Sequence, residues 1–413
     1  MSKLNNNLIA ALDIGTSKIA CYIASVDSAD NITILGVGHQ LSQGIRSGII
    51  TDMKLAENSI RSALGTAEQL AGVTVDKVIA NISGNKLSSE YIQSSLALKG
   101  QEVTAREISR LISQACDKYQ NSEREIIHCI PAEYSIDKSE DIHNPIGMFC
   151  NSIGSTMNLI TANSSGIVNL TNCLAQCHLN VEGYIASPYA SATACLTEDE
   201  KELGVTLLDF GAGNINIAIY KNGTIIYADT IPVGGQHITK DIAIGLSTNL
   251  ETAERLKTLN GNVFVTARDE QEIIDVPQIA EDGTSDITHI EKSKLINIIK
   301  PRAEEMLEMV NKKLGRIGRS NIGGNIVITG GACQLGGLAN LTSRMLNRQV
   351  RLGIAKPIEG MAESTKGPAF SCCAGMLILA ARQRKNRRYN FAAKRLLSSG
   401  RIGKTLAWLK ENF

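Results

Sequence analysis

Two short segments place a carboxylate directly after an apolar run and two residues before a glycine. Asp13-Ile14-Gly15 lies near the start of the chain, and Asp209-Phe210-Gly211 repeats the pattern half a chain later. Glycine lets backbone N–H groups come close to an anion, and a carboxylate can orient water or hold hydrated Mg²⁺. The two segments predict binding of a phosphorylated ligand, with Asp13 and Asp209 as candidate catalytic and metal-binding residues.

Each segment is typical of a β-hairpin, in which a buried strand ends at the aspartate and a second strand returns after a tight turn. The hairpins span residues 7–23 and 204–220. Thr16, Ser17 and Lys18 follow the first glycine and can donate hydrogen bonds to phosphate oxygens. One copy alone would favour an ordinary hairpin, but two copies favour two related lobes that share a cleft.

A third glycine cluster lies in the segment NIVITGGACQLGGL, residues 325–338. A buried strand runs into Gly330-Gly331, and we expect a helix from about Leu335. Such a junction lets backbone pass beside a flat ligand and directs a helix N-terminus toward it. Alone it would be an ordinary strand–helix turn, but it supports the predicted cleft because it follows the two hairpins.

The composition is that of a globular protein with room for two or more domains. The chain has 413 residues, of which 43% are hydrophobic and 20% charged. The net charge of +1 hides an asymmetry, because residues 382–413 hold ten Lys/Arg and one acid. That segment carries +9, which leaves −8 for residues 1–381. A basic tail on an acidic body predicts an anionic partner.

The ten cysteines are scattered without a CxxC pair, which is typical of reduced cytoplasmic thiols. Cys173, Cys177 and His178 have the spacing of half a metal site, but no second ligand pair follows, so we interpret them as packing residues. No secretory signal is evident at the N-terminus. The apolar stretch 369–381 is too short to span a bilayer.

The order of the two hairpins and the double-glycine turn resembles the actin/Hsp70/sugar-kinase ATPase superfamily. Within it, the chain resembles the FtsA family of bacterial cell-division proteins over nearly its whole length. Besides the expected terminal helix, the stretches that carry this resemblance are CIPAEYSID (129–137), NPIGM (144–148), LTEDEKELGV (196–205) and KPRAEEMLEMV (300–310). The resemblance implies an α/β, actin-like two-lobed ATPase fold with an inserted α+β (1C, SHS2-type) subdomain and a C-terminal amphipathic helix.

The resemblance also implies ATP and Mg²⁺ as cofactors, with Mg²⁺ held by Asp13 and Asp209 through water. Glu254 and Lys257, one helical turn apart, would contact the ribose and adenine; from the sequence alone they would be a solvated ion pair. The implied nucleotide-binding residues are Asp13, Gly15, Thr16, Ser17, Lys18, Asp209, Gly211, Gly213, Asn214, Gly234, Gly235, Glu254, Lys257, Gly330, Gly331 and Ala332.

The second hairpin departs from the family's pattern G-G-G-T-x-D. Here Ala212 removes a glycine, Asn214 replaces a hydroxyl and Asn216 replaces a carboxylate. An amide can bond to phosphate but cannot act as an anionic metal ligand or as a base. We therefore hypothesise that nucleotide binding survives while ATP hydrolysis is slow or absent. A turnover comparable to that of a sugar kinase would refute the hypothesis.

The resemblance divides the chain into subdomains. They are 1A (1–84, 161–203 and 369–381), 1C (85–160), 2A (204–234 and 303–368), 2B (235–302), a basic linker (382–399) and the amphipathic helix (400–413). Periodicity and capping residues predict helices at 53–72, 104–119, 187–197 and 369–381, and a strand at 77–84. We expect residues 262–285 to be the most loop-like part of the chain.

The last residues predict a membrane-surface helix. Ile402, Leu406, Leu409 and Phe413 fall within about 60° on a helical wheel, with Trp408 at the flank. This arrangement is typical of a helix that lies on a membrane rather than crossing it. The alternative is that the helix docks on the protein's own body. The basic side chains that would face anionic lipid are Arg401, Lys404 and Lys410.

The resemblance implies a peripheral protein on the cytoplasmic face of the inner membrane at the division septum. It would bind ATP, form filaments with itself, bind the C-terminal peptide of FtsZ through 2B and recruit other division proteins through 1C. We expect anionic inner-membrane lipid as a partner and no nucleic acid, because the tail has few aromatic side chains. The competing classes are a metabolic sugar-type kinase, an Hsp70-type chaperone and a pilus-assembly protein of similar fold.

Overall fold

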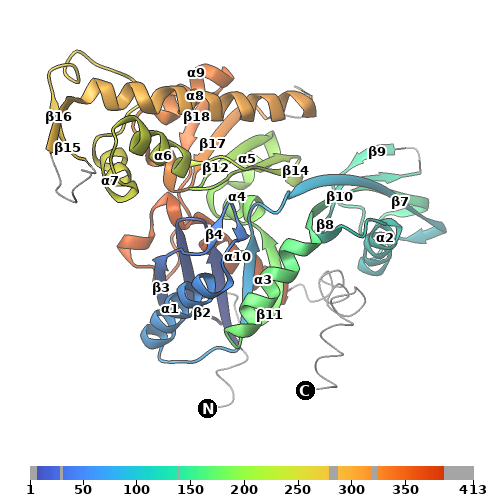
Figure 1. Ribbon diagram of the computed structural model, residues 1–413. Coiled ribbons are helices and arrows are strands. Elements are labelled where there is room, and N and C mark those ends of the chain that lie inside the picture. Colours follow the sequence, from blue (N-terminus) through green and yellow to red (C-terminus); the bar gives the residue numbers. More distant parts are fainter. Residues whose placement is uncertain (1–6, 28–30, 138, 279–286, 319–322, 386–413) are drawn as a thin grey trace.

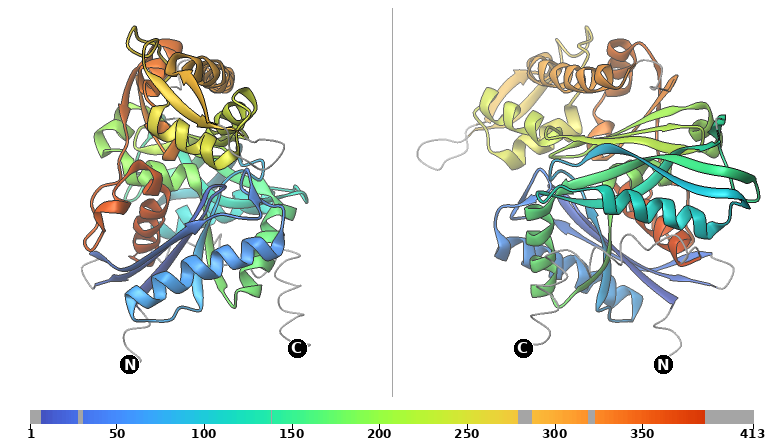
Figure 2. Two further views of the ribbon diagram at one scale, coloured as in Figure 1. Left: turned by 60° about the vertical axis from the view of Figure 1, so that its left-hand side comes forward. Right: turned by 90° about the vertical axis from the view of Figure 1, so that its right-hand side faces the viewer.

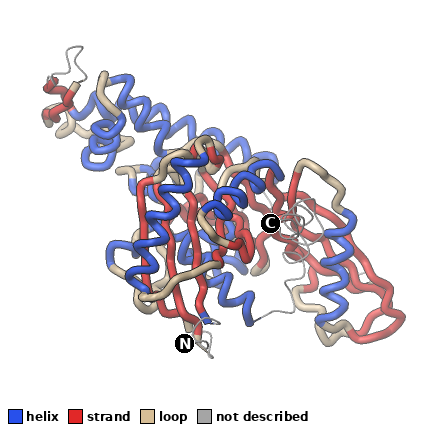
Figure 3. Tube along the Cα trace, turned by 60° about the horizontal axis from the view of Figure 1, so that its bottom comes forward, coloured by secondary structure: helices blue, strands red, loops and turns tan. Residues whose placement is uncertain are grey.

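The computed structural model describes residues 7–27, 31–137, 139–278, 287–318 and 323–385 (Figure 1). The predicted amphipathic helix, with Ile402, Leu406, Trp408, Leu409 and Phe413, lies outside the described residues, as does most of the basic linker. Two β-sheets form the frame, and helices pack around them (Figure 3). The expected actin-like α/β architecture is confirmed, including the α+β insert.

The first sheet has five strands in the order β11-β6-β1-β2-β3. Its central strands are apolar on both faces, as expected for a sheet covered on two sides, and the first predicted hairpin is β1–β2. The predicted strand at 77–84 ends two residues early. The bounds are β1 (Leu8–Ile14), β2 (Lys18–Val26), β3 (Ile32–Leu41), β6 (Lys77–Ile82) and β11 (Asn180–Ala186), with a small ladder of β4 (Ile45–Arg46) and β5 (Ile49–Ile50).

Helix α1 (Met53–Ala71) packs on β3 and β2, and α3 (Ser164–Gln176) lies beside it (Figure 2). Asp52 caps the start of α1 by accepting from the Leu55 N–H, and Gly72 ends it with φ 66°. The helix predicted at 53–72 is therefore confirmed. Gly38 of β3 allows the close contact, since a Cβ there would lie 1.9 Å from the Ala63 carbonyl oxygen of α1.

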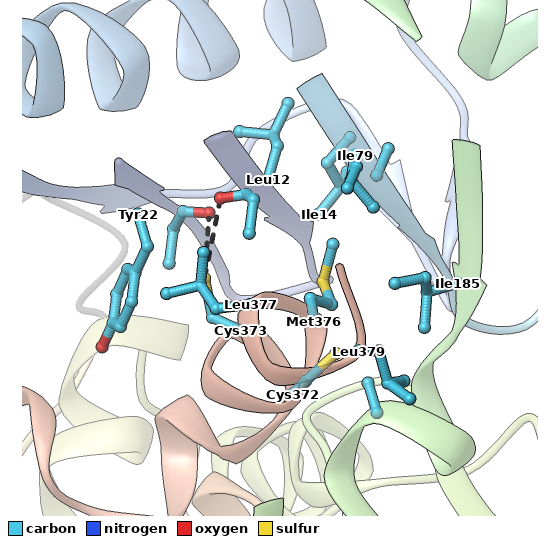
Figure 4. Close-up of a cluster of buried hydrophobic side chains, with 14 of the residues drawn as sticks. Leu12, Ile14, Tyr22, Ile79, Ile185, Cys372, Cys373, Met376, Leu377 and Leu379 are labelled. Atoms are coloured by element: carbon cyan, nitrogen blue, oxygen red, sulfur yellow. Dashed lines mark hydrogen bonds between the residues drawn. The ribbon is translucent and has the colours of Figure 1, made fainter. Parts of the chain in front are cut away.

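Helix α10 (Ser371–Lys385) packs against the opposite face of this sheet (Figure 4). The Cys373 thiol lies 3.7 Å from the carbonyl oxygen of Ala11, and the apolar side chains around it form the core of the first lobe. The helix predicted at 369–381 starts two residues later and runs four residues further. Its start is displaced because Pro368–Phe370 forms a 3₁₀ turn, η5.

Helix α4 (Ser187–Cys195) connects the lobes and is buried along nearly its whole length. It ends two residues before the predicted end at 197, because Leu196 is extended and Thr197 caps the next helix, α5 (Glu198–Leu203). Helices α4 and α10 cross closely, since a Cβ on Gly375 would lie 1.8 Å from the Ala190 carbonyl oxygen.

The second sheet has nine strands in the order β18-β17-β12-β13-β14-β7-β10-β8-β9. It joins the second lobe to the insert, and the second predicted hairpin is β12–β13. The lobe's strands are β12 (Val205–Phe210), β13 (Ile215–Lys221), β14 (Thr224–Ile231), β17 (Asn325–Thr329) and β18 (Gln349–Leu352). The insert's strands are β7 (Ser88–Glu102), β8 (Arg124–Ile136), β9 (Ser139–Ile142) and β10 (Phe149–Asn163).

The two halves of this sheet meet at β14 and β7, where Asp229 pairs with Ser88 (Figure 2). Side chains from the insert extend the contact along β14. Asn158 donates to the Ile225 carbonyl at 3.0 Å, and the Tyr91 hydroxyl donates to the Ile226 carbonyl at 2.6 Å. The insert's helix α2 (Ala105–Lys118) has a Thr104–Glu107 capping box and confirms the helix predicted at 104–119.

The far end of the second lobe is mainly helical and carries a small hairpin (Figure 1). The expectation of loop at 262–285 is wrong in part, because residues 273–277 form a strand that buries Ile274 and Val276. This strand pairs with residues beyond the stretch, so its partner was not evident locally. The elements are α6 (Gly235–Gly245), α7 (Leu250–Asn260), β15 (Ile273–Pro277), β16 (Ile287–Glu291) and α8 (Lys292–Ile317).

The helix expected from about Leu335 begins at Leu338 instead, as α9 (Leu338–Leu346). Residues Gly331–Gln334 form a 3₁₀ turn, η3, and Gly337 has φ 77°. A left-handed residue cannot continue a right-handed helix, so the two segments stay separate. Among the described residues, no helix is long and apolar enough to cross a membrane.

Candidate functional site

A cleft of 530 Å³ opens between the two lobes. The cleft is lined by the turns of both hairpins, by the double-glycine turn, and by side chains of α4, α7 and α10. Of the predicted nucleotide-binding residues, only Gly234 does not line it. Those that do are Asp13, Gly15, Thr16, Ser17, Lys18, Asp209, Gly211, Gly213, Asn214, Gly235, Glu254, Lys257, Gly330, Gly331 and Ala332.

The first hairpin turn is closed by a hydrogen bond of 3.0 Å from the Gly15 N–H to the Lys18 carbonyl. A Cβ on Gly15 would lie 2.7 Å from that same carbonyl oxygen, so the turn needs glycine. The Thr16 hydroxyl oxygen accepts from the Gly48 N–H at 3.3 Å. The turn therefore borders the cleft with its backbone tightly folded.

Asp13 lies one residue before the end of β1, and the side-chain amide of Asn81 holds its carboxyl group. Its Oδ1 accepts from the Asn81 Nδ2 at 2.8 Å, while the Asn81 Oδ1 accepts from the Ile14 N–H at 2.7 Å. Burial raises the pKa of Asp13 to about 6, Lys18 opposes this rise and Asp209 adds to it. The carboxyl group is thus held in a fixed orientation in a site poor in solvent.

Asp209 lies one residue before the end of β12, on the other side of the cleft. Its Oδ2 accepts from the Ser191 hydroxyl at 2.8 Å and from the Asn216 Nδ2 at 3.3 Å. Burial raises the pKa of Asp209, and these two hydrogen bonds and Lys18 oppose the rise. The two predicted carboxylates therefore face one cleft from separate lobes.

Lys18 provides a buried cation beside them. Its Nζ donates to the Ala369 carbonyl at 2.5 Å and lies 3.4 Å from the centroid of the Phe370 ring. Burial lowers the pKa of Lys18, and Asp13 opposes this effect. The Lys18 ammonium group is therefore partly desolvated and can pair with an anion in the cleft.

The second hairpin turn contacts the first lobe directly. The Gly213 carbonyl accepts from the Ser47 hydroxyl at 3.1 Å, and the Asn214 Nδ2 donates to the Ser83 hydroxyl at 3.3 Å. A Cβ on Gly213 would lie 2.4 Å from the Thr16 Oγ1. The Asn214 Oδ1 is buried and has no hydrogen-bond partner among the described residues.

Asn216, where the family's pattern has a carboxylate, is fully engaged. Besides donating to Asp209, it accepts through Oδ1 from the Thr230 hydroxyl at 3.1 Å and from the Ser83 hydroxyl at 3.4 Å. A neutral amide can hold Asp209 in this way, whereas a second carboxylate beside it would add like-charge repulsion.

The remaining end of the cleft is built by α6, α7 and the double-glycine turn. Lys257 pairs with Glu254 at 2.6 Å and donates to the Gly235 carbonyl at 3.2 Å. Gly330 has φ 88°, and a Cβ there would lie 2.3 Å from the Asp209 Oδ1. Gly234 lies beneath the second turn, where a Cβ would be 2.5 Å from the Gly211 carbonyl oxygen.

The sequence analysis missed several cleft residues, among them Asn81, Ser83, Ser187 and Cys372. Asn81 and Ser83 had a usable signal, because β6 pairs in parallel with β1 and the ends of parallel strands meet at one edge. Ser187 and Cys372 lie on helices, and no local pattern marks their inward direction.

Among the described residues, no group of three or more His, Cys, Asp or Glu side chains is placed to hold a metal ion directly. Two separate carboxylates remain compatible with a hydrated Mg²⁺, which keeps most of its water ligands. Cys173 and Cys177 are buried in the core of the first lobe, as the packing interpretation requires.

The two lobes, the paired hairpin turns and the interlobe cleft define the protein as a member of the actin-like ATPase fold class. A solved PilM–PilN type IV pilus biogenesis complex aligns with TM-score 0.64 and 16% identity, over 90% of this chain and 98% of that chain. MreB5 of Spiroplasma citri bound to ADP aligns with TM-score 0.54 and 13% identity, over 93% and 99%. At these identities the likeness shows the fold alone.

Sequence relatives are more specific. Residues 206–375 match the family Cell division protein FtsA, and residues 84–161 match the SHS2 domain inserted in FTSA. Cell division protein FtsA of Rhizobium meliloti is 36% identical over 99% of this chain and 95% of that protein, and that of Escherichia coli is 29% identical over 99% of each. The chain belongs to the FtsA family of cell division proteins, which argues against the kinase, chaperone and pilus-protein alternatives.

Proposed function

We propose that the protein is an ATP-binding, membrane-tethered actin-like protein that anchors FtsZ filaments to the inner membrane during division. The observation that carries the nucleotide part is the convergence of two Asp-x-Gly hairpin turns and a double-glycine turn on one cleft. A cleft of 530 Å³ falls within the usual range for small-molecule sites.

The residues present fit Mg²⁺-ATP. The phosphates would lie between the turn at Gly15–Lys18 and the turn at Gly211–Asn214, where glycine permits close backbone approach. The unpartnered Asn214 Oδ1 is a buried acceptor for which an ordered water in the cleft offers a donor. The adenosine would lie between Glu254–Lys257 and Gly330–Ala332.

Asp13 and Asp209 would hold Mg²⁺ through water, and Lys18 would neutralise phosphate charge. When bound, Mg²⁺-ATP supplies a charged group that both lobes contact at once. Asn216 leaves the cleft without a third carboxylate near the phosphates, which supports slow or absent hydrolysis. Steady-state phosphate release at saturating ATP tests this, and turnover at the level of a sugar kinase would contradict it.

The division role rests on family membership and on surfaces that could receive protein partners. Residues 235–302 would form subdomain 2B, which would bind the FtsZ C-terminal peptide, and they expose Ile244 and Leu259. The insert, residues 85–160, would recruit other division proteins, and it exposes Phe149 at 72%. Filaments would form between copies of the chain.

The membrane part rests on the sequence of the tail. Residues 382–413 carry ten Lys/Arg and one acid and end in the predicted amphipathic helix. Arg401, Lys404 and Lys410 would contact anionic lipid while Ile402, Leu406, Trp408, Leu409 and Phe413 enter the interface. The protein would therefore be peripheral, on the cytoplasmic face at the septum.

Liposome co-sedimentation tests the proposal most directly. The full chain and a version ending at Ser399 are mixed with anionic vesicles, each with and without Mg²⁺-ATP. We expect only the full chain to sediment with vesicles, to a degree that ATP changes, and to carry added FtsZ with it. If both versions stay in the supernatant, the tail docks on the body and the tether is wrong.

A further inference from the structure

Helix α4 carries two buried serine hydroxyl groups, one bonded directly to Asp209 and the other connected to Asp13 through Asn81. We propose that Ser187 and Ser191 are positioning residues that hold Asp13 and Asp209 in the orientation that the Mg²⁺-nucleotide complex requires. This inference rests on the proposed nucleotide binding. It assigns a role in that binding to the helix that connects the two lobes.

Ser191 acts on Asp209 directly. Its hydroxyl donates to the Asp209 Oδ2 at 2.8 Å, and the side chain is fully buried. The other donor to that oxygen is the Asn216 amide at 3.3 Å, which is the longer contact. Hydrogen bonds to ionised groups are stronger than neutral ones, so loss of the serine frees the carboxylate to rotate.

Ser187 acts on Asp13 through one intermediate. The Asn81 Nδ2 donates both to the Asp13 Oδ1 at 2.8 Å and to the Ser187 hydroxyl at 3.0 Å. The Ser187 hydroxyl in turn donates to the Ile82 carbonyl at 3.1 Å. Asn81 is 3% exposed and Ser187 is 2% exposed, so these contacts are largely shielded from bulk solvent.

The two serines are four residues apart, which puts them on one face of the helix. Helix α4 leaves the first sheet after β11 and leads through α5 into β12 of the second sheet. A single rigid element therefore sets the positions of two carboxylates that belong to different lobes. Neither serine needs to touch the nucleotide, which is why the role is positioning and not catalysis.

Thr193 offers a matched control on the same helix. It is also buried, at 5% exposure, but its hydroxyl donates to the Tyr189 carbonyl of its own helix at 2.9 Å and otherwise meets the side chain of Tyr220, not a carboxylate. Removing it deletes one buried hydroxyl and disturbs no carboxylate. A general effect of weakening α4 would therefore appear equally in Thr193→Ala and in the serine variants.

The test measures the affinity of the full chain for a fluorescent ATP analogue, with Mg²⁺ and with EDTA, for wild type, S187A, S191A and T193A. We expect S191A to weaken binding about tenfold with Mg²⁺ and to leave it unchanged with EDTA. S187A should do the same to a smaller degree, since Asn81 keeps its bond to Asp13. T193A should match wild type in both conditions.

The melting temperature without nucleotide is recorded for every variant as a measure of folding. If S191A melts below the assay temperature, the affinity of S191C is compared with that of wild type in the same two conditions. The cysteine thiol is similar in shape to the serine hydroxyl and is a weaker hydrogen-bond donor. Equal weakening with Mg²⁺ and with EDTA, or an effect of T193A as large as that of S191A, overturns the inference. Wild type that fails to bind the analogue overturns the proposed function, and the inference with it.

Discussion

His128 should make the folded protein less stable in mild acid. It lies in β8 of the insert, where its Nε2 accepts from the Ala186 N–H at 3.0 Å and its ring meets Tyr189 edge-on at 5.1 Å. Burial lowers the pKa of His128 from 6.5 to about 4. The folded state therefore keeps the ring neutral at a pH where the unfolded chain takes up a proton.

The sign follows from proton linkage. A pKa that folding depresses gives stability that is present above pH 6.5 and is lost as the pH falls toward 4. Between pH 7 and pH 4.5, His128 should reduce the free energy of unfolding by about 2.5 kcal/mol. Asp13 acts in the opposite direction, because its raised pKa of about 6 makes protonation favour the folded state.

The contribution of Asp13 over the same range is about 2 kcal/mol in the opposite direction, so the pH profile of the wild type alone does not isolate His128. The assay therefore compares wild type with H128Q, whose amide oxygen can still accept from Ala186. Urea unfolding is followed by circular dichroism at both pH values without nucleotide, and H143Q, at an exposed histidine, is the control.

We expect the free energy of unfolding of H128Q to lack the decrease that His128 causes between pH 7 and pH 4.5. H143Q should show the same pH dependence of stability as wild type. The difference between wild type and H128Q should grow by about 2.5 kcal/mol from pH 4.5 to pH 7, in favour of wild type. If the difference stays constant with pH, His128 is not held neutral by burial, and the reasoning fails.

Three other substitutions test contacts described above. G38A should lower the melting temperature, at a cost of about 3 kcal/mol, because a Cβ there would lie 1.9 Å from a backbone oxygen of α1; G65A, in open space on α1, should be neutral or stabilising. G330A should abolish nucleotide binding measured by fluorescence, since its φ is 88° and its Cβ would lie 2.3 Å from Asp209. R124A should speed hydrogen exchange across the insert, because Arg124 donates to Ser88 of β7, where the chain enters the insert, and to the Thr161 carbonyl of β10, where it leaves; unchanged exchange would contradict this.

The hairpins of the cleft could be predicted because their signal is local. Asp13 and Asp209 each lie between an apolar run and a glycine, so each turn can be recognised from a few neighbouring residues. Gly330 was found for the same reason. Gly234 lies in a similar glycine-containing segment, but it packs under the Gly211 turn and does not line the cleft. No local sequence pattern distinguishes these two positions of a glycine.

The parts that could not be predicted depend on pairing between distant segments. Asn81 reaches Asp13 only because β6 and β1 are neighbours, and Ser191 reaches Asp209 only because of how α4 crosses beneath the cleft. The strand at 273–277 was missed because its partner, residues 287–291, lies across a polar stretch. The start of α9 was misplaced by the left-handed Gly337.

The shared nine-stranded sheet also constrains the order in which the chain can fold during synthesis. The insert's four strands lie within residues 88–163 and pair with one another, so they can form while the second lobe is still being made. The free edge of β7 must then wait for β14, since Ser89 and Ala228 are 139 positions apart. Such long-range closure is slow, and an open strand edge invites pairing with other chains. The junction between insert and lobe is therefore the place where a nascent chain is most exposed to misassembly.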